Sequence, residues 1–157
     1  MDITVIDIAL HHVGIQTADL KNSIDWYTEF FDADCAWTLD RFSELTLERL
    51  PGITELAEIK LGSARFHLFE RSAIDPAPAD SRANSDYQHV CLVVDSPETL
   101  KELRERWFTL HRSGRFAFAG DELPTEIVVD DDGVESFYAL DPNGLEFEIT
   151  YSPVAHR

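Results

Sequence analysis

Positive charge is scarce in this chain. Only three of the 157 residues are lysine, and 13 lysines and arginines stand against 30 aspartates and glutamates, giving a formal net charge of −17. Such a surface repels phosphate backbones and anionic lipid headgroups. We therefore expect neither a nucleic-acid partner nor a membrane partner.

Cysteines and long apolar runs are also scarce. Cys35 and Cys91 lie in apolar patterned segments without the paired spacing of a zinc site, so we expect buried, reduced thiols. No apolar run approaches the ~18 residues of a membrane span, and Met1–Thr4 has no positively charged leader-like segment. The composition predicts one cytoplasmic globular domain, residues 1–157.

The first half of the chain reads as a strand, a helix and further strands. Residues 8–16 alternate as a strand does, and Asp19 is placed to cap a helix. Apolar residues of that helix recur with helical spacing: Leu20, Ile24, Tyr27 and Phe31. Turn signals at 51–52 and 62–63 separate the strands expected after it, which are 35–39, 45–50, 57–61 and 64–70.

The same order then restarts after a linker at 71–86, which has two prolines and no periodicity. A strand is expected at 87–94, and Ser96-Pro97 is typical of a helix start. The remaining expected strands are 115–119, 126–129, 136–140 and 145–151. The sequence thus predicts an α+β fold of two βαβββ modules, about 6–70 and 87–151, whose sheets enclose a shared cleft.

Three histidines and a glutamate occupy matching points of these two modules. His12 and His89 are 77 residues apart, and each lies in an expected strand that leads into an amphipathic helix. Each is followed, 55 and 59 residues later, by a polar residue within an apolar strand, His67 and Glu148. A lone histidine in such a strand is usually a hydrogen-bonded core residue, but four matched positions favour one metal site where the modules meet.

These motifs resemble the vicinal oxygen chelate superfamily, which includes glyoxalase I, methylmalonyl-CoA epimerase, extradiol dioxygenases and the bleomycin- and fosfomycin-resistance proteins. The resemblance extends from about Ile6 to Tyr151. Its markers are His12-Val13-Gly14-Ile15, Asp19-Leu20, Tyr27, Tyr87-Gln88-His89-Val90 and the segment from Phe137 to Glu148, which contains Asp141-Pro142-Asn143-Gly144. In this order and spacing they are specific for the superfamily and not for a reaction.

The resemblance implies that the metal ligands are His12, His67, His89 and Glu148. Glu146, nearer the turn, is the second choice for the carboxylate. His11 matches a position that is not normally a ligand, and adjacent strand residues face opposite sides. A histidine at position 67 departs from the family, in which glyoxalases and epimerases have Glu or Gln there, so His67 has the alternative role of a base or donor facing the substrate.

The donor set restricts the metal without identifying it. Imidazoles and one carboxylate suit Fe, Mn, Co, Ni or Zn as divalent ions. The resemblance implies that Glu148 both binds metal and transfers a proton, and it gives Tyr138 either a catalytic or a packing role. Five further residues have both a site role and, with more weight, plain surface exposure as alternatives: Arg41, Glu44, Glu48, Arg65 and Arg115.

Three functions follow from the resemblance. The first is a metal-dependent isomerase, epimerase or lyase that chelates a small oxygen-bearing substrate and stabilises an enediolate-type intermediate. The second is a one-domain Fe(II) extradiol-type dioxygenase. Against it, the histidines that such enzymes use to activate oxygen beside the metal ligands are not evident before His89 or between Thr125 and Ser136. The third is a metal-free antibiotic-binding resistance protein, which typically lacks the ligand set. The partner expected in the first two is a small-molecule substrate, with a homodimer as an open alternative.

Overall fold

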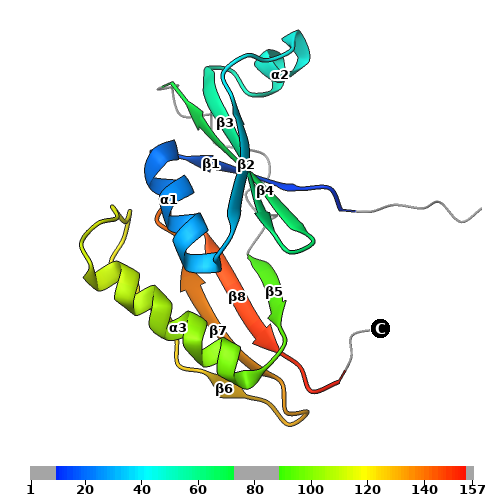
Figure 1. Cartoon of the computed structure of the whole chain (residues 1–157), viewed down its shortest axis with the longest axis vertical. Helices are drawn as coiled ribbons and strands as arrows, with labels where there is room; N and C mark the ends of the chain where they lie inside the picture. The colour runs from blue at the N-terminus through cyan, green and yellow to red at the C-terminus, as the bar shows by residue number, and fades with distance from the viewer. Residues whose placement is uncertain (1–9, 73–88, 155–157) are drawn as a thin grey trace, which may run out of the picture.

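The structure, a computed structural model, describes residues 10–72 and 89–154. Within these ranges eight strands and three helices follow one another in two similar halves. Figure 1 shows the halves one above the other, with the helices α1 (Leu20–Phe31) and α3 (Pro97–Arg112) next to each other.

Each half contains a mixed four-stranded sheet. The first sheet has the strand order β1 (Val13–Thr17), β4 (Ala64–Arg71), β3 (Ile53–Leu61) and β2 (Asp34–Leu39). The second has the order β5 (Val90–Val94), β8 (Glu146–Tyr151), β7 (Glu135–Leu140) and β6 (Val128–Val129). β1 is parallel to β4 and β5 is parallel to β8, whereas the remaining pairs are antiparallel. Among the described residues, β1 and β5 pair with no second strand and so form sheet edges. The predicted α+β fold of two βαβββ modules is confirmed.

Local signals in the sequence set the ends of the two long helices. The Asp19 side chain accepts a hydrogen bond from the Asn22 backbone N–H, and the Ser96 side chain accepts one from that of Thr99. Pro97 occupies the first position of α3, where its missing N–H costs nothing. Both predicted helix starts are confirmed.

Each sheet packs one face against the helices, and no helix of the described chain covers the other face, which we call the open face. On the first sheet Ile15, Phe66 and Leu68 are buried against α1, and the residues that alternate with them point to the opposite face. On the second sheet Phe137 and Ile149 are buried in the same core. This alternation decides which side chains are available for a site, because helices fill the other face.

The two modules share one hydrophobic core and a buried polar link. Phe147 of β8 packs against Tyr27 and Phe31 of α1, with ring centroids 6.0 and 5.4 Å apart. The Tyr27 hydroxyl donates a 2.8 Å hydrogen bond to Asp141 Oδ2 in the turn between β7 and β8. In that turn Gly144 has φ +88°, a conformation that glycine adopts without strain.

One predicted strand is a helix. Residues 45–50 lie mostly in α2 (Glu44–Arg49), because the Ser43 side chain caps a helical turn by accepting a hydrogen bond from the Thr46 N–H. The alternating leucines that suggested a strand, Leu45 and Leu47, are 66% and 47% exposed and face no sheet. Glu44 and Glu48 are exposed, as expected for surface charge.

The strand predicted at 115–119 is absent from the described chain. Its backbone bonds elsewhere: the Ala117 N–H donates to Asn22 Oδ1 of α1, and the Ala119 N–H donates to the Pro142 carbonyl. The segment therefore ties the two modules together instead of extending the second sheet.

Parts of two expected strands and most of the expected linker lie outside the described residues, and the expected burial of the cysteines is wrong. Residues 8–9 and 87–88 of the expected strands, and 73–86 of the expected linker, lie outside the described ranges. Cys35 and Cys91 are free but exposed, so the expectation of buried thiols is wrong. In the described residues, no helix has the length and apolar character to cross a membrane.

Candidate metal centre

Three histidines gather on the open face of the first sheet. His12 and His67 stack with ring centroids 3.7 Å apart and an interplanar angle of 10°. His11 lies edge-on to this stack, and its Nδ1 is 2.8 Å from His12 Nδ1. Possible ligand atoms of the three residues all lie within 4.8 Å of one another, the spacing of a metal-binding group.

Strand register explains why these side chains meet. β1 and β4 are parallel with Gly14 opposite His67, so His12, two residues before Gly14, projects from the same face. Both histidines precede β1, which begins at Val13, and His11, one residue farther from the strand, does not follow the alternation that His12 keeps. The expectation that His11 points away from His12 is wrong for this reason.

Glu58 completes this group from the neighbouring strand. In β3 it stands opposite His67, and its Oε2 lies 2.9 Å from His67 Nε2. The Glu58 side chain is 3% exposed and that of His67 is 14% exposed. Arg65 adds a weaker ion pair, with its Nη1 3.8 Å from Glu58 Oε1.

The electrostatics of this group suit a cation. The hydrogen bond from His67 is the main cause that lowers the pKa of Glu58, so its carboxylate stays ionised. Burial, followed by the neighbouring His67 and His11, lowers the pKa of His12. A histidine binds a metal ion through its neutral imidazole, so the lowered pKa of His12 favours a cation at this group.

A second group lies on the open face of the second sheet. His89 Nε2 is 3.2 Å from Glu148 Oε2, and His89 Nδ1 is 3.7 Å from Glu146 Oε1. The Tyr138 ring stands edge-on to that of His89 with centroids 5.4 Å apart. Tyr138 is opposite Glu148 in the register of β7 and β8, as Glu58 is opposite His67 in the first sheet.

The polar side chains around Glu148 have raised pKa values or hydrogen bond to its carboxylate. Burial raises the pKa of Tyr138, and the negative charge of Glu148 raises it further, so the phenol stays protonated and able to donate. Partial desolvation also raises the pKa of the Cys91 thiol, which lies opposite Glu148 in β5. The Thr150 hydroxyl, 3.3 Å from Glu148 Oε1, supplies a hydrogen bond to the carboxylate.

The two groups do not merge in one copy of the chain. Among residues 10–72 and 89–154, the potential metal-binding group contains His11, His12 and His67 and no residue of the second module. The structure thus brings His12 together with His67 and His89 together with Glu148, as two half-sites on separate sheets. That all four bind one ion stays a prediction.

Sequence reasoning missed Glu58 as a partner of His67. The turn at Gly62-Ser63 was visible, and with Leu61 paired to Ala64 it sets the hairpin register that places Glu58 opposite His67. Counting back from the turn would have found this contact. The approach of His11 to His12 had no such signal, since it depends on where β1 begins.

The three arginines considered as substrate anchors are surface or structural residues. Arg115 is exposed and forms an ion pair with Glu29 of α1, and Arg41 is exposed in a loop. Arg65 is half-buried beside Glu58 and is the one nearest to a half-site.

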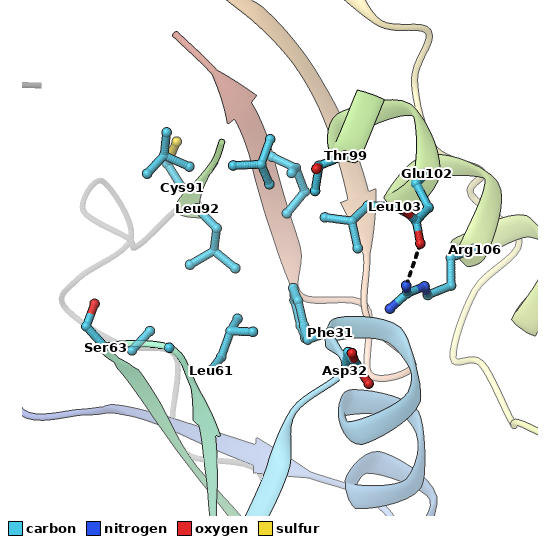
Figure 2. A pocket seen from close by; sticks show the side chains of 15 residues that line it. Phe31, Asp32, Leu61, Ser63, Cys91, Leu92, Thr99, Glu102, Leu103 and Arg106 are labelled. Carbon is cyan, nitrogen blue, oxygen red and sulfur yellow. Dashed lines mark hydrogen bonds and ion pairs between the residues drawn. The ribbon is translucent and has the colours of Figure 1, made fainter. Parts of the chain in front are cut away.

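A cavity of the described chain runs along the edge of the second sheet formed by β5. It has a volume of about 690 Å³ and lies between the β3–β4 turn, β5 and α3. Figure 2 shows Leu61 and Ser63 on one side, Cys91 and Leu92 of β5 on another, and Arg106 paired with Glu102 at the far end. A second cavity of about 450 Å³ includes Gln16 and Thr17 at the end of the other free edge strand, β1.

Comparison with known proteins agrees with this architecture. The family model of the Glyoxalase/Bleomycin resistance protein/Dioxygenase superfamily matches residues 9–149, nearly the whole chain. The chain belongs to this superfamily. The match includes both half-sites and the Asp141–Gly144 turn that joins the modules. No curated protein matches the chain.

Solved structures of superfamily members have the same fold. A glyoxylase/bleomycin resistance protein/dioxygenase domain from Frankia sp. EAN1pec has a TM-score of 0.69 at 19% identity, with 96% of each chain covered. Lactoylglutathione lyase from Agrobacterium tumefaciens has a TM-score of 0.58 at 19% identity, with 91% of this chain and 92% of that chain covered. FosX of Listeria monocytogenes, a fosfomycin resistance protein complexed with Mn(II) and sulfate, has a TM-score of 0.60 at 14% identity, with 95% and 96% covered. At these identities the likeness shows the fold alone.

Proposed function

We propose that the protein is a metal-dependent isomerase, epimerase or lyase acting on a small substrate with neighbouring oxygen atoms. The observation that carries the proposal is the pair of matched half-sites. Each places the histidine that immediately precedes the edge strand beside a donor from the adjacent parallel strand, on the face that no helix of the described chain covers. His12, His67, His89 and Glu148 are the proposed ligands of one divalent Fe, Mn, Co, Ni or Zn ion.

A second copy of the chain is the proposed means of joining the half-sites. β1 and β5 are free sheet edges in the described chain, and a cavity lies at each of them. Unpaired strand edges favour association with another strand. In a two-fold dimer, module one of each copy would meet module two of the other, and both sites would be completed at once.

The residues around the second half-site suit proton transfer. A metal ion held by imidazoles and a carboxylate acts as a Lewis acid on adjacent substrate oxygens. Glu148 is the proposed base that removes a proton from the carbon beside the carbonyl, and Thr150 orients its carboxylate through a hydrogen bond. Tyr138, whose pKa is raised by burial and by Glu148, would donate a hydrogen bond to substrate oxygen.

An Fe(II) extradiol-type dioxygenase is the second candidate, favoured by the edge-on contact of Tyr138 with His89. Against it, His89 is itself a proposed metal ligand, and the other described side chains opposite or beside Glu148 in the sheet are Cys91, Tyr138 and Thr150. None of these three is a second histidine that could assist oxygen chemistry. Oxygen uptake by the Fe(II)-loaded protein with catechols would favour this candidate. A metal-free binding protein is disfavoured because it has no need of two ionisable donor groups.

Metal content and isotope exchange together test the proposal. Protein purified without chelators should contain one transition-metal ion per chain, and it should exchange solvent deuterium into a 2-oxo acid or acyl thioester at the carbon beside the carbonyl. Protein without bound metal, even after incubation with each of the five ions, would contradict the proposal. Cytoplasmic location and a small-molecule substrate are part of the same proposal.

A further inference from the structure

His11 is the one member of the three-histidine group that the proposed function does not use. It is exposed and precedes β1, yet its Nδ1 lies 2.8 Å from that of His12, and its ring stands edge-on to both His12 and His67. Three imidazoles therefore converge on one sheet without any contribution from the second module.

The hydrogen bonds of this group prepare it for a cation. His67 Nε2 is engaged by Glu58, which leaves Nδ1 of that ring as the free acceptor nitrogen. Since His11 and His12 face each other through Nδ1, one of these nitrogens must act as an acceptor for the other. A divalent ion in place of that shared proton would accept an electron pair from each of these nitrogens and from Nδ1 of His67.

We propose that His11, His12 and His67 form a complete three-histidine site that binds a divalent transition-metal ion within module one, with Glu58 orienting His67. The site holds the ion before His89 and Glu148 reach it. The inference rests on the proposed function for His12 and His67, and it adds His11 as a ligand and module one as the first binding place of the metal.

The number of ligands shows why His11 can bind the ion only until His89 and Glu148 bind it. In a six-coordinate ion, His11 together with the four proposed ligands would leave one position, whereas a substrate chelating through two oxygens needs two. His11 must therefore leave the ion when His89 and Glu148 arrive. Its position in the segment before β1, outside the strand ladder, allows that movement.

Trp37 offers a local measurement of metal binding. Its ring lies 5.2 Å from that of His67, centroid to centroid, whereas Trp26 and Trp107 are buried in the helix-side core. A paramagnetic ion at the three-histidine site should quench Trp37 fluorescence. The probe is Co²⁺, titrated into the full-length H89A/E148Q protein so that the second half-site contributes no ligand.

The expected result is quenching that saturates at one Co²⁺ per chain and disappears in the W37F background. Adding H11A, or H11Q as a second variant, should weaken the apparent affinity at least about tenfold, since even outer-sphere partners of a ligand are worth that much. H111A is the matched control, because His111 stacks on Trp107 far along α3, and it should leave the affinity unchanged. Equal melting temperatures of the variants exclude unfolding as the cause.

Two results would contradict this inference and leave the proposed function standing. The first is an unchanged affinity for Co²⁺ in both His11 variants, and the second is the absence of Co²⁺ binding by H89A/E148Q while the wild type binds it. Wild type that binds no metal would contradict both the inference and the proposed function. Intact, His11-dependent quenching without isotope exchange in the wild type would contradict only the proposed function.

Discussion

His67 Nε2 and Glu58 Oε2 lie 2.9 Å apart at a position where the carboxylate is almost fully buried. A buried carboxylate without a partner would be costly, so the contact fixes both the ring and the acid. It also selects which nitrogen of His67 faces away from Glu58. The role of His67 thus depends on a residue in the neighbouring strand.

Replacing that acid should weaken metal binding while the fold is kept. We expect E58Q to lower the affinity for Co²⁺ about 10- to 100-fold, because a neutral amide holds the His67 ring less firmly and does not increase its basicity. Co²⁺ titration followed by Trp37 fluorescence measures the change. E55Q is the control, since Glu55 is exposed in the same strand, and an equal loss in both variants would contradict the role of Glu58.

Substitutions in the second half-site should distinguish the roles of Glu146 and Glu148 in proton transfer. E148Q should slow isotope exchange by about 10²–10⁴-fold, the usual contribution of a general base. E146Q should have a much smaller effect, because Glu146 is 3.7 Å from His89 and Glu148 is 3.2 Å from it. The reverse order of effects would assign the proton transfer to Glu146.

Metal removal should change stability as well as activity. An ion that binds only the folded chain at a hundredfold excess over its Kd adds about 2.7 kcal/mol. For a chain of this length, that is roughly 5–10 °C in Tm. Calorimetry of EDTA-treated protein, before and after adding back each ion, measures the shift, and an unchanged Tm with every ion would contradict a specific site.

The contribution of the Tyr27–Asp141 hydrogen bond to the free energy of unfolding should be measurable independently of the metal centre. Tyr27→Phe removes the hydroxyl that donates to the buried Asp141, and we expect the free energy of unfolding to fall by about 1.5–3 kcal/mol. Urea denaturation measures it. Tyr138→Phe, on the open face, should change stability by less than about 0.5 kcal/mol. Equal effects would mean that the Tyr27 hydroxyl has no special role.

The same link predicts a pH dependence. Burial raises the pKa of Asp141 above its ordinary value of 3.8, although hydrogen bonds from Leu145, Tyr27 and Asn143 oppose the shift. A raised folded-state pKa means that the native chain binds the proton more tightly than the unfolded chain. The contribution to stability is therefore complete below pH 3.8 and is lost as the pH rises through the folded-state pKa.

D141N cannot titrate, so the stability advantage of wild type over D141N should shrink as the pH rises from 3.8 through that window. Comparing the two chains cancels the pH dependence of the other acidic groups. A gap that widens with increasing pH would contradict the raised pKa.

Much of the fold was predictable because its signals are local. Asp19 and Ser96 act as caps within their own turns, and the helical spacing of Leu20, Tyr27 and Phe31 correctly indicated the buried face of α1. The strand predicted at 45–50 was wrong because the Ser43 cap favours a helix there, and no neighbouring strand supports the alternating pattern. Local alternation is a weak guide where a strand would have no partner.

The candidate site was predictable in its halves and not in its assembly. His12 with His67, and His89 with Glu148, meet because parallel strands bring equivalent positions together. Whether the two pairs then meet depends on how the modules pack, and here Tyr27, Phe31 and Phe147 pack them through the helix side. That packing leaves the two open faces as separate half-sites, a property that no sequence repeat encodes.

Mixing two inactive variants tests most directly whether these half-sites belong to one metal centre. H12A disables module one and E148Q disables module two, so each homodimer should be inactive in isotope exchange. After subunit exchange, a mixed dimer pairs the intact module one of E148Q with the intact module two of H12A. Random mixing of equal amounts should then restore about a quarter of wild-type activity, as one intact site in half of the dimers requires. Activity that stays at the level of the separate variants after complete subunit exchange would contradict a metal centre shared between two copies.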